Sequence, residues 1–331
     1  METEPVMSVR NLSTVYHGRS SSVRAVDDVG FDLHAGSTLG LVGESGSGKS
    51  ATAMSIMRMI APSAGKIVSG SILLEGKDVM QMRREELRSM RGGRIGFVPQ
   101  DPLTSLNPLI TIGEQIAEML REHKGASWRS ALNTAAELLD RVGIPNARKR
   151  LKDFPHQFSG GMRQRVAIAM AVSCDPIVLL ADEPTTALDV TTQAQILELL
   201  KGLATDNGMA TLLITHDLGV AANMCDQIRV MYAGQIVEGA DIVSFFQHPK
   251  TPYAAGLMAA LPSARPDSNG RLVAIPGAPP SLAQELAGCR FAARCPQRRD
   301  VCGVDEPYLT PRESPGHLAR CWGTESEGWI A

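Results

Sequence analysis

Eight consecutive residues, from Gly43 to Ser50, have the types and the spacing that bind a nucleoside triphosphate. They fit the P-loop pattern GxxxxGK[ST]. The glycines let the backbone curl so that its amide groups face the phosphates. Lys49 would hold the β- and γ-phosphates, and the hydroxyl group of Ser50 would bind Mg²⁺. We therefore predict ATP binding through Gly43, Ser45, Gly46, Gly48, Lys49 and Ser50.

Two adjacent carboxylates, Asp182 and Glu183, follow an apolar run at 177–181 that is typical of a buried strand. In open α/β sheets, ligands bind at the carboxyl ends of the strands. Asp182 is therefore predicted to serve the magnesium ion, and Glu183 to be the base that orients the attacking water. The alternative is that both acids only cap the next helix.

Two further polar side chains, Gln100 and His216, come at the ends of apolar runs at 95–98 and 211–215. A glutamine there can reach the magnesium ion or the water, and a histidine there can reach the γ-phosphate. Each is weak alone, because loop glutamines and structural histidines are common. Their order along the chain with the P-loop and the acid pair predicts that Gln100 and His216 act with Glu183 in catalysis.

Ser159, Gly160 and Gly161 open a long apolar helix, and exposed amides at a helix start bind anions. The P-loop upstream already accounts for the phosphates of one ATP. We therefore expect this second anion site to serve the ATP of another subunit. That arrangement predicts a dimer that closes around nucleotide.

These residues need an α/β scaffold, and residues 1–260 alternate short apolar runs with amphipathic stretches in the pattern of a largely parallel sheet. Strands are predicted at 38–42, 95–98, 177–181 and 211–215, and a helix at 51–60. Between 110 and 160, three- and four-residue spacing of apolar side chains predicts an inserted helical subdomain, with helices at 112–122 and 128–142.

From residue 261 the composition changes. Five prolines between 262 and 280 predict a linker over 261–285, and a cysteine-rich C-terminal extension follows over 286–331. Its thiols suit an iron–sulfur cluster or tetrahedral zinc, although their spacing lacks the paired CxxC of zinc sites and matches neither common ferredoxin spacing. Unligated or redox cysteines are a third alternative. The four cysteines are Cys289, Cys295, Cys302 and Cys321.

Other charged and thiol side chains receive plainer interpretations. Cys174 and Cys225 are expected to be core residues, because free cysteine behaves as a small hydrophobe. The arginines among the four cysteines are expected to form a solvated face or to contact a partner; they are Arg290, Arg294, Arg298 and Arg299.

Charge and hydropathy narrow the partners of the 331-residue chain. With 33 basic and 35 acidic side chains, the net charge of −2 gives no electrostatic footprint for nucleic acid. No apolar run approaches the roughly 20 residues of a spanning helix, and the acidic N-terminus is unlike a secretory signal. We expect a soluble, cytosolic chain whose membrane role comes through partners.

Taken in order, these motifs, with Ala187-Leu188-Asp189, resemble the nucleotide-binding domain of ABC transporters over about residues 1–260. The resemblance implies antiparallel strands near the N-terminus and an aromatic residue, best matched by Tyr16, that stacks on adenine. It implies that the Ser-Gly-Gly run contacts the γ-phosphate held by the partner's P-loop, and that Asp189 lies in the dimer-spanning loop. The flanking Phe158 and Met162 depart from the common Leu-Ser-Gly-Gly-Gln signature, but its phosphate-binding core is intact.

Three further stretches, 100–108, 232–238 and 248–262, resemble the ATPase subunits of dipeptide, oligopeptide and nickel importers. That resemblance implies an ATP-hydrolysing, energy-coupling subunit that uses ATP and Mg²⁺, with peptides as the first cargo. It implies a 4Fe-4S cluster on the four cysteines, with Zn²⁺ as the alternative. The expected partners are a second, homologous ABC ATPase subunit, two transmembrane permease subunits and, indirectly, an extracytoplasmic solute-binding protein. The chain would lie at the cytoplasmic face of the inner membrane.

Three alternatives stay open. The same role could serve an importer of nickel or another small solute, because this chain would not touch the cargo. A non-transport ABC ATPase acting on DNA or ribosomes is disfavoured, because no long coiled-coil insert or tandem ATPase half is visible in the sequence. An exporter subunit is disfavoured by the cysteine extension.

Overall fold

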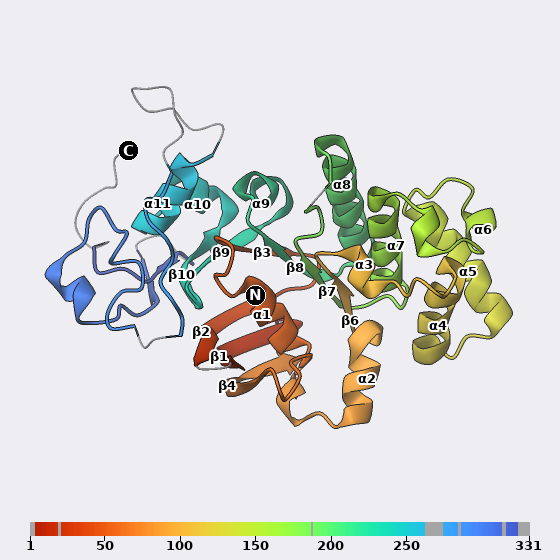
Figure 1. The fold of residues 1–331 in the computed structure, drawn as a ribbon, viewed down its shortest axis with the longest axis horizontal. Coiled ribbons are helices and arrows are strands. Elements are labelled where there is room, and N and C mark those ends of the chain that lie inside the picture. The colour runs from red at the N-terminus through yellow and green to blue at the C-terminus, as the bar shows by residue number, and fades with distance from the viewer. Residues whose placement is uncertain are drawn as a thin grey trace. The chain divides into compact units, whose positions relative to one another are not determined.

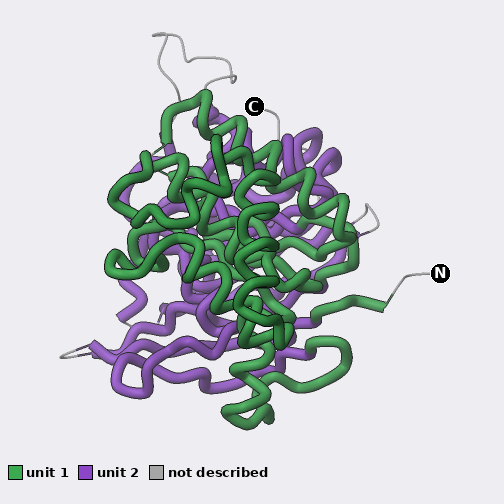
Figure 2. Tube along the Cα trace, turned by 90° about the vertical axis from the view of Figure 1, so that its right-hand side faces the viewer, with its two compact units in different colours: residues 1–7, 33–38, 74–213 green, residues 8–32, 39–73, 214–331 purple. Residues whose placement is uncertain are grey.

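The computed structural model describes residues 4–18, 21–186, 188–261, 274–283, 286–312 and 316–323. The chain divides into two compact units, coloured separately in Figure 2. Unit 1 comprises residues 1–7, 33–38 and 74–213, and unit 2 comprises residues 8–32, 39–73 and 214–331. Most of the predicted linker lies outside the described residues, which resume at 274.

The strands of unit 1 follow the order β8-β7-β6. β6 (Ile95–Val98) pairs in parallel with β7 (Val178–Asp182), with Ile95 opposite Val178. Every residue of β7 and of β8 (Ala210–Thr215, mostly in this unit) is buried, as expected for parallel strands covered on both faces. The three strands predicted here are confirmed to within a residue at each end.

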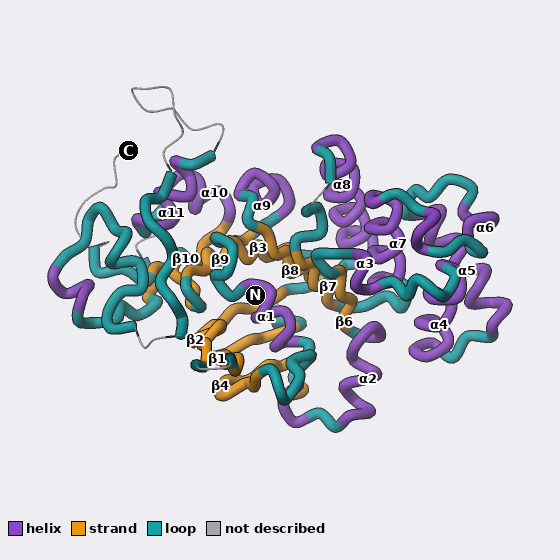
Figure 3. The backbone as a smooth tube through the Cα atoms, viewed as in Figure 1, coloured by secondary structure: helices purple, strands orange, loops and turns teal. Residues whose placement is uncertain are grey.

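Helices make up most of the rest of unit 1. The predicted helices at 112–122 and 128–142 are confirmed as α4 (Ile112–Lys124) and α5 (Trp128–Arg141). Thr111 and Glu114 form a capping box at the start of α4, and Gly125 ends that helix in the left-handed conformation. Figure 3 shows helices α4 to α7 gathered together. The other helices are α2 (Arg84–Gly93), α3 (Pro102–Ser105), α6 (Ala147–Arg150), α7 (Gly160–Val172) and α8 (Val190–Asn207). Short pieces are β5 (Lys77–Asp78), η1 (Val79–Gln81) and η2 (Pro155–Gln157).

Unit 2 contains the N-terminal strands, which are antiparallel as predicted. β1 (Met7–His17) lies between β2 (Ser22–Leu33) and β4 (Gly65–Leu74), as can be followed in Figure 1. Fully buried apolar side chains such as Leu12, Val26 and Ile72 form their core face.

A second group of strands in unit 2 follows the order β11-β12-β10-β9-β3. β3 (Thr38–Val42) pairs in parallel with β9 (Gln227–Tyr232), and β10 (Gln235–Asp241) pairs antiparallel with β9. β9 and β10 are joined by the two residues Ala233 and Gly234. Both have positive φ, 47° and 89°, as a type I′ β-hairpin turn requires. The C-terminal extension adds β12 (Leu318–Ala319) and β11 (Thr310–Pro311) to β10, so it shares a sheet with the rest of unit 2.

The helices of unit 2 are short. The helix predicted at 51–60 is α1 (Lys49–Ile56), which ends earlier because Arg58 turns to a positive φ of 48°. The others are α9 (Leu218–Met224), α10 (Ile242–Gln247), α11 (Pro252–Ala259) and η3 (Asp300–Gly303). In the described part of the chain, no helix has both the length and the apolarity to cross a bilayer.

Candidate nucleotide site and cysteine-lined cavity

The P-loop joins β3 to α1, the strand-then-helix context that its pattern requires. Gly43 and Gly48 have φ of 155° and 108°. A Cβ atom on Gly43 would lie 2.1 Å from the carbonyl oxygen of Met231, and one on Gly48 would lie 2.1 Å from that of Ala25. Glycine is therefore required at both positions by close packing as well as by backbone conformation.

Lys49 is buried to 4% exposure. Its Nζ donates hydrogen bonds to the carbonyl oxygens of Gly43, at 2.8 Å, and Glu44, at 2.9 Å. Ser45, Gly46 and Ser50 are exposed. The loop thus curls around its own lysine, and these three residues, which are predicted to bind ATP, lie at the surface.

In unit 1, the structure brings Gln100 and Glu183 together. Gln100 Nε2 donates to Glu183 Oε2 at 3.0 Å, and the Thr186 hydroxyl donates to the same oxygen at 2.9 Å. Asp182 is the last residue of β7 and is 6% exposed, whereas Glu183 turns to a positive φ of 46°. The backbone turn separates the two carboxylates, which suits the different roles predicted for them.

The Ser-Gly-Gly run forms the start of α7, as predicted. Ser159 is the N-cap, and its Oγ accepts the Met162 N–H at 3.4 Å. Ser159 and Gly160 are exposed, and a Cβ on Gly160 would meet nothing within 4 Å. Phe158 is 2% exposed. It anchors the run while leaving the serine and the first glycine open to solvent.

Asp189 caps α8 through its side chain, which accepts the Thr192 N–H at 3.0 Å and the Thr192 hydroxyl at 2.7 Å. These hydrogen bonds, the backbone one first, lower the pKa of Asp189 below its usual value. The structure therefore places a charged, locally ordered acid at this helix start. Ala187, in the same motif, lies outside the described residues.

The two remaining predicted residues belong to unit 2. Tyr16 lies near the end of β1, and partial burial raises its pKa. His216 follows β8 directly and is exposed, and the next residue, Asp217, caps α9. The predicted site residues therefore divide between the two units. Unit 2 carries Tyr16, the P-loop and His216, and unit 1 carries Gln100, the acid pair and the Ser-Gly-Gly run.

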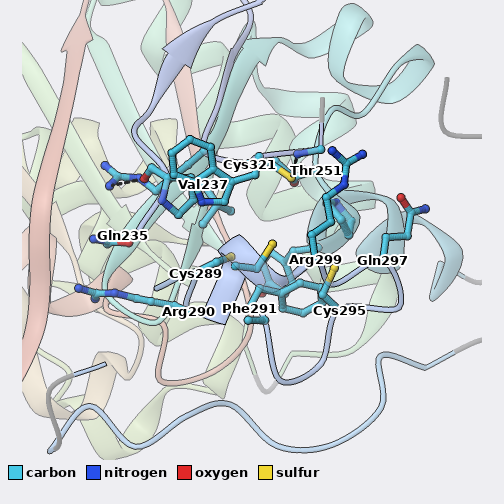
Figure 4. Close-up of a pocket in the computed structure, with 18 residues that line it drawn as sticks. Gln235, Val237, Thr251, Cys289, Arg290, Phe291, Cys295, Gln297, Arg299 and Cys321 are labelled. Atoms are coloured by element: carbon cyan, nitrogen blue, oxygen red, sulfur yellow. Dashed lines mark hydrogen bonds between the residues drawn. The ribbon is translucent and has the colours of Figure 1, made fainter. Parts of the chain in front are cut away.

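All four cysteines of the extension line one cavity of about 40 Å³ within unit 2 (Figure 4). The Cys289 N–H donates to the carbonyl oxygen of Cys302 at 2.9 Å, which ties two of the cysteine-bearing turns together. Residues spread from 289 to 321 thus reach a single place.

Backbone amides support three of the four sulfurs in the same way, from two residues further along the chain. Phe291 and Gln297 donate to the thiols of Cys289 and Cys295, and Gly323 donates to Cys321 Sγ at 3.4 Å. Burial raises the pKa of Cys289 to about 11, and it also raises the pKa of Cys295 and Cys321. Buried thiols of this kind become thiolates when something positive binds them. Within the described ranges, no group of three or more His, Cys, Asp or Glu side chains is arranged to hold a metal ion.

The expectation for the arginines of the extension is wrong for two of them, which point inward. Arg290 Nη1 donates to the Ala233 carbonyl at 2.5 Å, and its guanidinium also pairs with Asp27. Arg294 pairs with Glu44 of the P-loop at 2.7 Å. Both arginine side chains are 10% exposed or less. The sequence showed the charges, but it gave no sign of their distant partners.

Cys174 and Cys225 are buried, as predicted. Burial raises the pKa of both, that of Cys225 to about 12. Both thiols are therefore neutral core groups.

A P-loop between a strand and a helix, an acid pair at a strand end and a glycine-led helix define an α/β P-loop ATPase. The ABC transporter family matches residues 26–186. A family described as the oligopeptide/dipeptide transporter C-terminal region matches residues 237–302.

Relatives are similar over nearly the whole chain. The dipeptide transport ATP-binding protein DppD of Bacillus subtilis is 47% identical over 320 residues, covering 96% of this chain and 95% of that protein. The oligopeptide transport ATP-binding protein OppD of Haemophilus influenzae is 48% identical over 319 residues, covering 96% and 97%. The chain therefore belongs to the ATP-binding subunits of the ABC transporter family, and it is an ATPase.

A solved structure agrees with this assignment. The ATP-binding cassette MJ0796, described as a dimer bound to ADP and Pi, matches with a TM-score of 0.64 and 29% identity. The match covers 71% of this chain and 98% of that one. The remaining 29% of this chain is not covered by the match to that cassette.

Proposed function

We propose that the chain is the energy-coupling subunit of an ABC importer for di- or oligopeptides. The observation that carries the proposal is its similarity, at 46–48% identity over nearly the full length, to proteins named for dipeptide and oligopeptide transport. The match of residues 237–302 to the oligopeptide/dipeptide transporter C-terminal region supports the same cargo.

The predicted residues would share the work of ATP binding. Tyr16 would stack on adenine, and the P-loop amides with Lys49 would hold the phosphates. Mg²⁺ held by Ser50, Gln100 and Asp182 would neutralise the charge that develops on the β- and γ-phosphates. Ser159, Gly160 and Gly161 would contact the ATP held by a partner's P-loop, with Asp189 in the loop between the subunits.

Hydrolysis would depend on Glu183 as the base for the attacking water and on His216 at the γ-phosphate. The hydrogen bond from Gln100 to Glu183 supports this division, because it fixes the orientation of the carboxylate that would act as the base. Closure around two ATP molecules would move the membrane subunits, and product release would let them reopen.

We also propose the domain organisation and the partners. Residues 1–260 would form the nucleotide-binding domain, with the helical subdomain at about 110–160 following the movement of the membrane subunits. Residues 261–285 would be a linker to the extension. The partners would be a second ABC ATPase subunit and two permease subunits, which would hold the chain at the cytoplasmic face of the inner membrane.

Affinity purification of the full chain from its native membrane tests this function. We expect two membrane subunits and a second ATPase to copurify, and a peptide to be the ligand of the associated extracytoplasmic binding protein. Nickel or another small solute in that protein would overturn the peptide assignment but not the transport role. A chain that purifies without any membrane partner would overturn both.

The cysteine cavity supports a 4Fe-4S cluster on Cys289, Cys295, Cys302 and Cys321. Tetrahedral zinc with bonds of about 2.3 Å would need the sulfurs only ~3.8 Å apart, whereas a cluster spreads its cysteines over several irons. Backbone N–H groups donate to three of the four sulfurs, and such hydrogen bonds would stabilise the thiolates that either group binds.

Iron, labile sulfide and zinc analysis of anaerobically purified protein tests the cofactor. We expect iron and sulfide in a cluster ratio, with visible charge-transfer absorbance that is lost in a Cys302→Ser variant. Colourless protein with one zinc per chain would establish the alternative, and protein free of both would leave the cysteines unligated.

A further inference from the structure

Glu44, the second residue of the P-loop, is held by the C-terminal extension. Arg294 Nη1 donates to its Oε2 at 2.7 Å, and Arg294 Nη2 donates to its Oε1 at 3.0 Å. A bidentate guanidinium–carboxylate pair of this kind fixes the orientation of the Glu44 side chain as well as balancing its charge. Glu44 lies at a variable position of the motif, where the pattern requires no particular side chain.

Arg294 is itself firmly seated. Its guanidinium lies 5.7 Å from the Tyr232 ring centre and 5.8 Å from that of Phe291, and its Nε donates to the Pro276 carbonyl at 2.8 Å. Tyr253, which contacts both rings, accepts the Glu44 N–H on its hydroxyl at 3.0 Å. One aromatic cluster thus holds both the side chain and the backbone of Glu44.

The link continues to the lysine of the P-loop. The Glu44 carbonyl oxygen accepts the Lys49 Nζ at 2.9 Å and the Ser47 N–H at 3.2 Å. Anything that moves Glu44 therefore moves the group that positions the phosphate-binding ammonium. The Glu44 carboxylate also places a negative charge in a loop that binds a triphosphate, and like charges at short range repel.

We propose that Arg294 is a positioning residue of the nucleotide site, which neutralises and fixes Glu44 and so makes the C-terminal extension part of the ATP-binding machinery. Without Arg294, the Glu44 carboxylate is released beside the phosphates and Lys49 loses a fixed acceptor. The inference needs a P-loop that binds ATP. It does not depend on the cargo or on what the cysteines bind.

Calorimetric titration of the full chain with MgATP tests the proposal. Arg294→Ala is expected to weaken binding about tenfold, the usual size of coupling within one hydrogen-bonded network. Arg294→Lys, which keeps the charge but loses the bidentate pair, should lose less. The double variant Arg294→Ala/Glu44→Gln should recover most of the affinity, because the unpaired charge is gone.

Arg320 provides the matched control. It is buried like Arg294, precedes a cysteine as Arg294 does, and pairs with Asp28 rather than with the P-loop. Arg320→Ala should lower the unfolding temperature in the same way as Arg294→Ala. It should leave MgATP affinity within about twofold of the parent, because among the described residues its hydrogen-bond partners are Ile236, Pro307 and Asp28 rather than the P-loop.

A second pair of variants decides the matter even if Arg294→Ala does not fold, because the Glu44 side chain is 25% exposed and tolerates change. Glu44→Asp keeps the charge but shortens the reach to Arg294, whereas Glu44→Gln removes the charge. The proposal expects Glu44→Asp to bind MgATP more weakly than Glu44→Gln. It is overturned if that order is reversed, if Arg294→Ala binds like the parent, or if the double variant is as weak as Arg294→Ala.

Discussion

The P-loop and the cysteine cavity both belong to unit 2, but they are built in opposite ways. The P-loop takes its residues from eight consecutive positions, and the strand before it and the helix after it set its shape. The cavity collects four cysteines from a stretch with little regular structure, and distant contacts hold that stretch in place. Contiguous sites can be recognised by pattern, whereas dispersed sites depend on anchors that no local pattern reveals.

The anchors of the extension are charged side chains that pair with residues from the N-terminal part of unit 2. Arg290, Arg294 and Arg320 pair with Asp27, Glu44 and Asp28, which lie at least 250 positions earlier in the chain. The curl of the P-loop comes from its own glycines and from the hydrogen bonds of Lys49, and Arg294 acts on the loop only through the Glu44 side chain. The two sites should therefore respond differently to substitution.

The largest effect should come from a residue of the contiguous motifs. Glu183→Gln keeps the shape of the side chain but removes the base, so ATP turnover by the assembled transporter should fall about 10²–10⁴-fold. ATP binding should persist. Steady-state phosphate release measures turnover, and Arg320→Ala, an anchor of the extension, should stay close to the parent. Unchanged turnover in Glu183→Gln would contradict the catalytic assignment.

An anchor of the extension should matter most for stability. The fully buried Glu238 carboxylate accepts the Lys250 N–H and the Thr251 hydroxyl, both at 2.7 Å, and lies 2.9 Å from His317 Nε2. Glu238→Ala leaves these buried groups without their hydrogen-bond partner, so it should lower the free energy of unfolding by about 3–5 kcal/mol.

Urea denaturation measures that loss, with Asp241→Ala as the control. Asp241 only caps α10 from an exposed position, so its replacement should lower the free energy of unfolding by about 1 kcal/mol. Equal losses in the two variants would show that the buried network around Glu238 contributes no more to the free energy of unfolding than a helix cap does.

Two glycines of the P-loop differ in why glycine is needed: Gly46 by its backbone conformation, and Gly48 also by close packing. Gly46 has a φ of 77° with open space around it, so Gly46→Ala should lower the free energy of unfolding of the nucleotide-free protein by about 1 kcal/mol. Gly48→Ala adds a clash with the Ala25 carbonyl and should lower it by about 3 kcal/mol. Thermal or urea unfolding tests the order, and an equal loss would mean that packing relaxes freely around Gly48.

The smallest expected effect is a change in how much stability the protein loses at acid pH. Burial raises the pKa of Asp27, but hydrogen bonds from Arg24 and Arg290 outweigh it and hold the pKa below its usual value. The stabilisation is present above the pKa of the unfolded chain and is lost as pH falls through the lower pKa of the folded chain.

Asp27→Asn should therefore lose less stability than the parent on acidification, by about 1 kcal/mol between pH ~7 and pH ~3. Urea midpoints at the two pH values measure the difference. Asp32→Asn, at a more exposed ion pair with Arg10, should behave like the parent. Parallel acid losses in Asp27→Asn and the parent would remove Asp27 from the set of anchors.

Many of the strands and helices that carry the predicted nucleotide-binding residues could be predicted from the sequence, because the patterns that mark them are local. Apolar runs at 177–181 and 211–215 read directly as buried strands, and Ser159 before two glycines marks the start of α7. The helix after the P-loop was predicted too long, because its periodicity continues past Arg58 although the backbone turns there. The meeting of Gln100 with Glu183 depended on the parallel pairing of β6 with β7.

By itself, the sequence determined which chemistry this protein can perform, because phosphate-binding glycines, a lysine and strand-end acids are contiguous and act through the local backbone. It also showed that four cysteines are gathered within residues 289–321, where they could bind a common ligand or stay unligated. Only the tertiary structure decided that the arginines beside them turn inward and that one of them holds the P-loop. The physical reason is that burying a charge costs free energy unless partners compensate it, and the carboxylate that pairs with Arg294 lies 250 residues away in the chain.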